Sequence, residues 1–330
     1  MKHKYLSFLI CLFVLACESP VSPIPEPGCE DEAYRTQGEK VFSTAFERTQ
    51  GRPQEAVEKL FGQDNNIGKI SSWEGLDLHP LIGEFRIDYQ GGTASQRHAI
   101  ISCGAGALFG PVYCSSGLEL MIKNPYIFEN GEVSRANVSA QLRGNTCLSQ
   151  LYSKAQMYLG TNFNYLRSWD QNWEELTITE IWSEPDLEGN YPFSIRVDII
   201  KASADIDAGL IFKFSAIRHD TKEVVWVERA ANFPIPVKER IDLEIFIKEG
   251  NSEEGEFAVS ARVEGEDRIM IFETTNFTHH PNDPTPNGYE RFEPFKLATD
   301  KELLNYLGQD SRSLKVHWDN WEFWRNKSYF

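Results

Sequence analysis

The second half of the chain alternates apolar and polar side chains with a period of two. Four segments show this alternation clearly: 193–200, 210–217, 241–248 and 257–263. Successive side chains of a β-strand point to opposite faces, so the alternation predicts strands that bury one face. Many such segments, separated by Gly, Asn and Asp, predict an all-β fold built as an antiparallel sandwich or barrel.

The first half repeats this pattern less regularly. Val41–Glu47 is a candidate first strand, and short helices are predicted at Pro53–Phe61 and Asp300–Leu307, where apolar residues recur at helical spacing. About 300 residues can bury most of their unfolded surface in a single domain, so we expect one domain over residues 31–330. Five further strand candidates precede the clear segments: 83–89, 97–102, 118–123, 134–142 and 153–159.

The N-terminus predicts export. Lys2 and Lys4 precede an apolar run that is too short to span a bilayer, so residues 1–16 are predicted to be a signal peptide. The run ends in Leu-Ala-Cys17, which resembles the lipobox of bacterial lipoproteins. This resemblance implies that Cys17 is lipidated and becomes the mature N-terminus; a plain signal peptide with an ordinary Cys17 thiol is the alternative.

A proline-rich segment follows the lipidation candidate. Residues 17–30 contain Pro20, Pro23, Pro25 and Pro27, a composition that favours extended polyproline II and predicts a tether. Glu18, directly after the cysteine, resembles the surface-export signals of Bacteroidetes lipoproteins. Lipid chains on one residue would anchor the protein stably. We therefore expect an exported, lipid-anchored protein on the bacterial outer membrane, facing the cell surface.

The charge of the chain excludes some partners. Without Lys2 and Lys4, 31 of the 33 basic residues remain against 49 acidic ones, a net charge of −18. Nucleic-acid binding depends on neutralising phosphates, so nucleic acid is not expected as a partner. The same charge weighs less strongly against polyanionic glycans, because a local basic cleft could override it.

Four cysteines remain in the predicted domain and tether. They are Cys29, Cys103, Cys114 and Cys147, and an even number in an exported protein suggests two disulfides. The simplest pairing joins Cys103 to Cys114 across a glycine-rich loop and leaves Cys29 with Cys147. Free buried thiols are the alternative. No Cys-x-x-Cys spacing is present, so a structural zinc site is not expected.

Three segments together resemble the concanavalin A-like lectin/glucanase superfamily, and more narrowly the Bacteroidetes surface lipoproteins with that jelly roll. They are residues 233–237 leading into 241–250, where such folds place a linker and a long strand, residues 278–297, and residues 316–324. The likeness spans roughly residues 41–324 and implies an antiparallel jelly-roll β-sandwich. Members include lectins, binding modules, glycoside hydrolases and polysaccharide lyases, so the resemblance leaves the activity open.

A further strand is predicted at residues 175–184, and it carries the first site candidates. A period of two places Leu176, Ile178, Glu180, Trp182 and Glu184 on one face. In the glucanases that the chain resembles, Glu-x-Asp-x-Glu on one strand supplies the nucleophile, an assisting Asp and the general acid/base. The matching positions here are Glu180, Trp182 and Glu184, so the resemblance makes Glu180 and Glu184 catalytic candidates.

The spacing of this pair favours recognition over hydrolysis. The two Glu Cα atoms would be roughly 13 Å apart at a rise of about 3.3 Å per residue, and only inward-leaning side chains would approach the roughly 5–5.5 Å of retaining enzymes. Trp182 replaces the central Asp and adds bulk between the carboxylates. We therefore expect Trp182 to stack on a sugar, with Glu180 and Glu184 as acceptors for its hydroxyls.

Polar residues on neighbouring strands extend the predicted site. Arg196, Asp198, Lys213 and Glu244 occupy the non-core faces of their strands and are expected to form a polar cleft beside Trp182. A solvated outer face is the alternative, and burial in the core is the default for the other tryptophans.

A lyase is the other enzymatic interpretation. The resemblance implies a Tyr or His that abstracts a proton, with Arg, Asn or Gln neutralising a uronate carboxylate. Closing strands of such enzymes carry Tyr-x-Lys-x-Gly-x-Tyr; residues 295–299 contain Lys296 but neither Tyr nor Gly. Arg97, His98 and Arg135 are further cleft candidates.

The remaining candidate is a metal site. Neighbouring His279 and His280 could share an ion only in a loop, and packing is the simpler role. Asp283 with Asn282 and Asn287 could hold a structural calcium, but a polar turn explains them as well. We predict no metal or cofactor.

These observations favour a cell-surface lipoprotein that binds polysaccharide through the concave face of a jelly roll. The first alternative is an enzyme of the same fold, either a polysaccharide lyase or an endo-glycoside hydrolase. The second is a non-catalytic structural or protein-binding envelope lipoprotein. The glycan, the choice between binding and cleavage, and the oligomeric state stay open.

Overall fold

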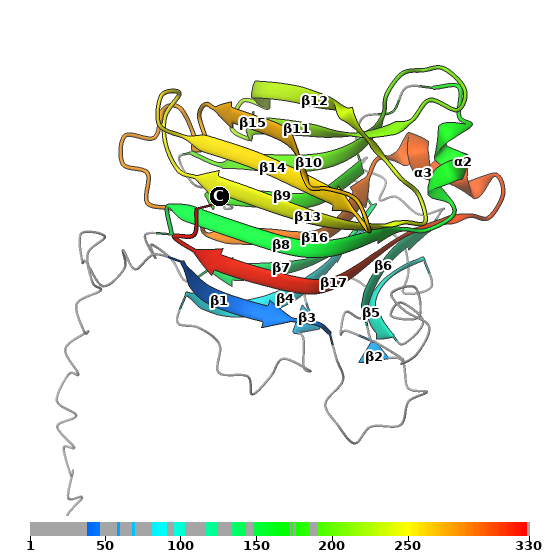
Figure 1. The fold of residues 1–330 in the computed structure, drawn as a ribbon, viewed down its shortest axis with the longest axis horizontal. Helices are drawn as coiled ribbons and strands as arrows, with labels where there is room; N and C mark the ends of the chain where they lie inside the picture. Colours follow the sequence, from blue (N-terminus) through cyan, green and yellow to red (C-terminus); the bar gives the residue numbers. More distant parts are fainter. Residues whose placement is uncertain are drawn as a thin grey trace, which may run out of the picture.

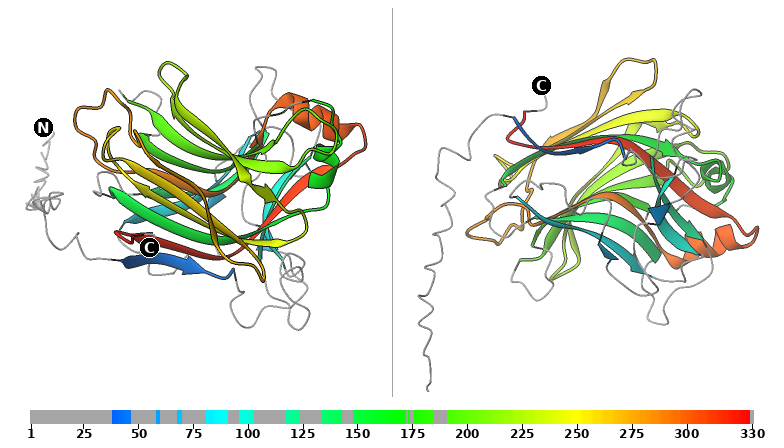
Figure 2. Two further views of the ribbon diagram at one scale, coloured as in Figure 1. Left: turned by 45° about the horizontal axis from the view of Figure 1, so that its top comes forward. Right: turned by 90° about the horizontal axis from the view of Figure 1, so that it is seen from below.

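Two antiparallel β-sheets pack face to face in this chain and are seen as stacked layers in Figure 2. The computed structural model describes residues 38–46, 58–59, 68–69, 81–90, 96–102, 117–123, 134–142, 148–171, 173, 176–184 and 191–328. The predicted all-β jelly-roll sandwich is therefore confirmed, and Figure 1 labels its strands.

Sheet A contains nine strands within the described residues. Its main path runs β15 (Ile269–Thr275), β14 (Glu256–Val263), β13 (Arg240–Lys248), β8 (Gln150–Leu159), β17 (Ser313–Arg325), β6 (Gly117–Lys123), β5 (Arg97–Ser102) and β2 (Glu58–Lys59). The remaining strand, β1 (Glu39–Thr44), pairs with β17. The chain's last strand thus lies in the middle of the sheet, between β8 and β6.

Sheet B contains eight strands within the described residues. They run in the order β12 (Glu223–Ile235), β11 (Leu210–Arg218), β10 (Phe193–Lys201), β9 (Leu176–Glu184), β16 (Arg291–Thr299), β7 (Ser134–Leu142), β4 (Ile82–Gln90) and β3 (Gly68–Lys69). Strand β16 lies between β9 and β7, so strands far apart in sequence form the centre of this sheet.

Aromatic side chains fill the space between the sheets. Trp321 is fully buried, and its ring contacts rings from both sheets, with centroid distances of 5.1 Å to Phe295, 5.8 Å to Phe85 and 5.3 Å to Phe42. Trp318 is also buried and lies 5.2 Å from Phe295. Burial of bulky rings stabilises such a core, as the default interpretation of the tryptophans assumed.

Two short helices lie at the same end of the sandwich in Figure 1: α2 (Phe163–Arg167) and α3 (Lys301–Gly308). The predicted helix at 300–307 is confirmed as α3. Asp300 caps it, because its Oδ1 accepts the backbone N–H of Leu303 at 2.9 Å. Helix α2 was not predicted, since five residues are too few to show a helical period.

Most predicted strands are confirmed, and two predictions are corrected. Glu58–Lys59, predicted within a helix at 53–61, pairs as a strand with β5; the rest of that range lies outside the described residues. Residues 233–235, expected in a linker, end strand β12. Pro234 fits there because β12 is an edge strand, where an unpaired backbone position faces outward.

Several predictions fall outside the part of the chain that the structure describes. They are the signal peptide at 1–16, the tether at 17–30 with Cys17, the domain start at residue 31, and all four disulfide candidates Cys29, Cys103, Cys114 and Cys147. No helix in the described ranges is long and apolar enough to cross a membrane.

Candidate functional site

A β-bulge in β9 decides which of its side chains leave the core. Thr177 pairs with Asp198 while Thr179 pairs with Val197, so β9 has one residue more than β10 at Ile178. An extra residue breaks the two-residue alternation of a strand. The predicted face that joined Leu176 and Ile178 to Glu180 and Trp182 is therefore wrong.

Instead, the apolar residues on both sides of the bulge point into the core. Leu176, Ile178 and Ile181 belong to the buried apolar cluster, whereas Thr177, Glu180 and Trp182 line a cavity on the outer face of sheet B. The bulge thus keeps Leu176, Ile178 and Ile181 in the core, although the first two are two positions apart and the last two are three positions apart.

A second bulge, in β16, places two charged residues on the same outer face. Phe292 pairs with Ala140 and Phe295 with Val138, which leaves one extra residue on β16 between the two phenylalanines. Both phenylalanines remain in the core. Glu293 and Lys296, three positions apart, consequently lie on the same side and form an ion pair at 2.5 Å.

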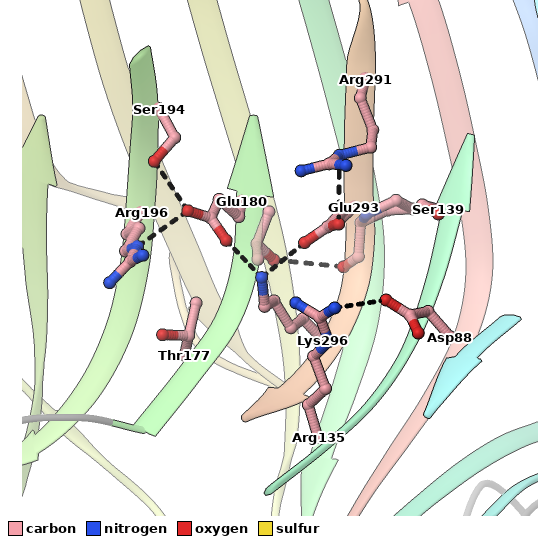
Figure 3. Close-up of polar contacts among 12 residues, drawn as sticks. Asp88, Arg135, Ser139, Thr177, Glu180, Ser194, Arg196, Arg291, Glu293 and Lys296 are labelled. Atoms are coloured by element: carbon pink, nitrogen blue, oxygen red, sulfur yellow. Dashed lines mark hydrogen bonds and ion pairs between the residues drawn. The ribbon is translucent and has the colours of Figure 1, made fainter. Parts of the chain in front are cut away.

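Lys296 joins two buried carboxylates at the centre of the site (Figure 3). Its Nζ contacts Glu180 as well as Glu293, and its side chain is only 6% exposed. Glu180 also accepts hydrogen bonds from Arg196 Nε at 2.8 Å and from Ser194 Oγ at 2.7 Å. The oxygens of Glu180, whose side chain is 1% exposed, are therefore occupied by protein donors.

These contacts keep Glu180 ionised. Burial by itself raises the pKa of Glu180, but the charges of Lys296 and Arg196 and the hydrogen bonds from Lys296 and Ser194 hold it well below its usual range. Glu180 therefore positions Lys296 and Arg196, and it is not an open acceptor for sugar hydroxyls.

The cavity has a volume of about 430 Å³ and a basic lining. Four of the lining side chains are cationic: Arg135, Arg196, Lys213 and Lys296. Two are carboxylic acids, Glu180 and Asp198. Among the lining side chains, cations thus outnumber acids by two when both acids are ionised, in a chain whose net charge is −16. Two of these cations also pair with carboxylates outside the lining: Arg135 with Asp88 at 2.6 Å and Lys296 with Glu293.

The pKa of Asp198 shifts in the opposite direction from that of Glu180. Burial raises its pKa, and this effect outweighs the opposing influence of Lys213 at 3.4 Å and of the Thr177 hydroxyl, which donates to its Oδ1 at 2.7 Å. A proton on Asp198 would make the cavity still more positive.

Trp182 forms a wall of the cavity and is not an exposed platform. Its ring stacks on His219 with a centroid distance of 4.4 Å, and the guanidinium carbon of Arg291 lies 4.5 Å from its centroid. The residue is 7% exposed. Among the described residues, its buried indole N–H has no hydrogen-bond partner.

His219 follows β11 and is oriented by Ser194. Because Ser194 Oγ donates its only hydrogen to Glu180, the 2.8 Å contact between Ser194 Oγ and His219 Nε2 requires a proton on Nε2. Burial lowers the pKa of His219 to about 4, so the ring is neutral at pH 7. In this tautomer, Nδ1 carries the lone pair.

The stability of the protein should therefore depend on His219 in mild acid. The unfolded chain takes up a proton near pH 6.5 and the folded chain only near pH 4, so stability is lost as the pH falls from 6.5 to 4. Replacing His219 with Gln should reduce this loss by about 2–3 kcal/mol. Denaturant unfolding at several pH values measures it, and an unchanged pH dependence in H219Q contradicts the neutral assignment.

The structure brings together five predicted site residues, separates one and does not describe the side chain of another. Glu180, Trp182, Arg196, Asp198 and Lys213 line the cavity. Glu244 lies on the other sheet, in β13, and pairs with Lys154 and with Arg268 at 2.7 Å. Glu184 ends β9, and its side chain lies outside the described part of the structure.

Sequence reasoning missed part of the site. Ser194 and His219 were not selected, although Ser194 shares the alternation of Arg196 and Asp198. Arg135 and Lys296 were considered only for a lyase. Arg97 and His98 lie in β5 of sheet A, where His98 contacts Glu119 at 2.7 Å.

The metal candidates have structural contacts. His280 Nδ1 accepts the backbone N–H of Asn282 at 3.1 Å, and His279 Nδ1 lies 2.9 Å from the carbonyl oxygen of His280. Asp283 accepts the backbone N–H of Thr285 at 2.9 Å. Within the ranges that the structure describes, no three His, Cys, Asp or Glu residues are placed to hold a metal ion.

Comparison with known proteins identifies similar folds only. No protein-family model matches this chain, and no curated protein sequence matches it. Among solved structures, it is similar to a marine alginate lyase from Aplysia kurodai, with 9% identity, a TM-score of 0.49 and coverage of 82% of this chain and 99% of that one.

Two further solved structures are similar to this chain at comparably low sequence identity. An endo-β-1,4-glucuronan lyase from Trichoderma reesei has 11% identity, a TM-score of 0.43 and coverage of 86% of this chain and 95% of that one. The exoplasmic domain of VIP36 has 9% identity, a TM-score of 0.39 and coverage of 76% and 87%. The two packed antiparallel sheets of this chain form the all-β sandwich that the sequence predicted.

Proposed function

We propose that this protein binds an acidic polysaccharide in the cavity on the outer face of sheet B. The observation that carries the proposal is the excess of cationic side chains in the cavity lining of a strongly acidic chain. A cleft lined by one sign of charge attracts ligands of the opposite sign. The acidic surface elsewhere would direct such a ligand to this place.

The distribution of the cations favours a polymer over a small anion. Lys213, Arg196, Lys296 and Arg135 come from β11, β10, β16 and β7, which span four strand spacings of sheet B. At about 4.8 Å per spacing, the basic lining extends over roughly 19 Å. Guanidinium groups pair with carboxylates through two parallel hydrogen bonds, so uronate sugars suit this lining.

Binding is favoured over hydrolysis by the state of Glu180. A nucleophilic carboxylate needs an accessible oxygen, and both oxygens of Glu180 contact Lys296, Arg196 or Ser194. The hydrolase alternative also required Glu184 as its partner, which the structure leaves undescribed. A recognition site needs only the cations that Glu180 orders.

Replacing Lys213 or Arg135 with Gln is expected to weaken binding to alginate or polygalacturonate about tenfold each. Hydrogen bonds to charged groups contribute roughly 1.5–3 kcal/mol, and both residues lie at the ends of the basic lining. Affinity electrophoresis and calorimetry measure the change, with xylan and laminarin as neutral comparisons.

Lys154→Gln is the matched control. Lys154 also pairs with a buried carboxylate, Glu244 at 3.8 Å, but on sheet A. Its replacement should leave binding unchanged. Equal weakening by K154Q and K213Q would contradict the placement of the site, and failure to bind any acidic polymer would contradict the proposed function and leave the protein-binding alternative.

Cleavage by β-elimination is a second candidate, favoured by His219. A neutral histidine with a lone pair on Nδ1 can accept the proton next to a uronate carboxylate, while neighbouring cations stabilise the resulting negative charge. The bond to the glycosidic oxygen then breaks as the carbon–carbon double bond forms, and the leaving oxygen takes up a proton from water. Lys296 matches the lyase motif, but Ala298 stands at its Gly position. Absorbance from unsaturated uronates that disappears in H219A supports cleavage; binding without new absorbance or reducing ends supports recognition alone.

We also propose that lipidated Cys17 anchors this domain at the cell surface. The lipobox resemblance and the proline-rich tether support the anchor. Metabolic labelling with a fatty-acid analogue should mark the protein, and Cys17→Ser should abolish the label. A label that persists in C17S contradicts lipidation at this residue.

A further inference from the structure

The β12 end of the cavity exposes apolar side chains. Val224 is 50% and Val227 is 49% exposed, and both line the cavity with Ile217. Two other large apolar residues in the described ranges are exposed, Ile206 at 66% and Ile269 at 40%, and neither lines the cavity. We call Ile217, Val224 and Val227 the apolar shelf.

Strand register places the apolar shelf beside the basic lining. Val224 pairs with Ile217 and Val227 with Ser215, and Ser215 pairs in turn with Arg196. Val227 is therefore one strand from Ser215 and two strands, roughly 10 Å, from Arg196. A sugar chain with its carboxylate at Arg196 would place a neighbouring substituent over the shelf.

The side chains at the β12 end of the cavity fit an acetyl ester. Such a group combines a methyl, which removes apolar surface from water, with a carbonyl oxygen that needs a hydrogen-bond donor. Ser215 lines the cavity between the shelf and Arg196 and can donate its hydroxyl hydrogen. The methyl group of a deoxy sugar would use the shelf but not this donor.

We infer that the ligand is an O-acetylated acidic polysaccharide whose acetyl methyl packs on the apolar shelf and whose acetyl carbonyl accepts from Ser215. This inference rests on the proposed binding of an acidic polysaccharide and adds a substituent to it. Burial of one methyl group contributes about a fourfold gain in affinity, and the added hydrogen bond brings the expected preference to about tenfold.

The test compares alginate and polygalacturonate, each chemically O-acetylated, with the same preparations after mild alkaline de-esterification. The wild type should bind the acetylated form of its preferred polymer about tenfold more tightly in calorimetry. V224S/V227S and S215A should reduce this preference, measured as the ratio of the affinities for the acetylated and the de-esterified form. I206S, which alters a more exposed apolar residue outside the cavity, should keep the preference.

The outcomes separate this inference from the proposed function. Equal affinity of the wild type for both forms overturns the acetyl site while binding of the acidic polymer stands. A preference that survives V224S/V227S also overturns it, because the acetyl group would then lie elsewhere. Tighter binding to an acidic polymer rich in deoxy sugars, regardless of acetylation, overturns the acetyl assignment. No binding to either form overturns both proposals.

Discussion

Replacing Lys296 with Met is expected to lower the free energy of unfolding by about 3–5 kcal/mol. Lys296 neutralises Glu180 and Glu293, and all three side chains are almost fully buried. Removing the ammonium group leaves Glu293 with Arg291 and Glu180 with Arg196, both with one cationic partner fewer. Denaturant unfolding at pH 7 measures the loss.

A rescue variant and a surface control test whether the loss of stability comes from the buried charges. Adding Glu180→Gln and Glu293→Gln to K296M removes the uncompensated charges and should recover part of the stability. Lys315→Met also removes a lysine from a carboxylate, Glu119 at 2.9 Å, but Lys315 is 42% exposed, so the loss should be below about 1 kcal/mol. Equal losses in K296M and K315M would show that Lys296 does not hold the site together.

Replacing Trp321 with Ala should also cost about 3–5 kcal/mol, because it leaves a large cavity between the sheets. Trp321 is fully buried and contacts phenylalanines from β1, β4 and β16. Its indole N–H also donates to Ser153 Oγ at 3.0 Å, a hydrogen bond that alanine cannot make. Thermal and denaturant unfolding measure the effect.

Trp324 provides the matched control on the same strand. It is only partly buried, on the outer face of sheet A, with Lys40 4.9 Å and Lys327 4.5 Å from its ring. W324A should therefore lower stability by less than about 1.5 kcal/mol. A larger loss in W324A than in W321A would contradict the assignment of Trp321 to the core.

Alternation predicted the strands because each sheet buries one face and exposes the other. The pattern was clearest in β10, β11, β13 and β14, and these strands were placed within a residue or two. It failed where local patterns are short: β2 was expected in a helix, and α2 was missed. It also missed that Pro234 belongs to an edge strand.

The polar positions of the site were recognisable for the same reason. Arg196, Asp198 and Lys213 interrupt otherwise apolar alternation on adjacent strands, and they do line the cavity. Glu244 shows the same pattern but lies on sheet A, since alternation reveals that a side chain leaves the core without revealing which sheet carries it.

The sequence by itself thus determined the strand pattern, the all-β class and which polar side chains interrupt otherwise apolar strands. The tertiary structure decided which of these polar side chains contact one another. Lys296 reaches Glu180, 116 positions away, because β16 inserts beside β9. Two bulges then turn Glu180, Glu293 and Lys296 to the same face. Sheet order and bulges depend on long-range pairing and packing, which local periodicity does not encode.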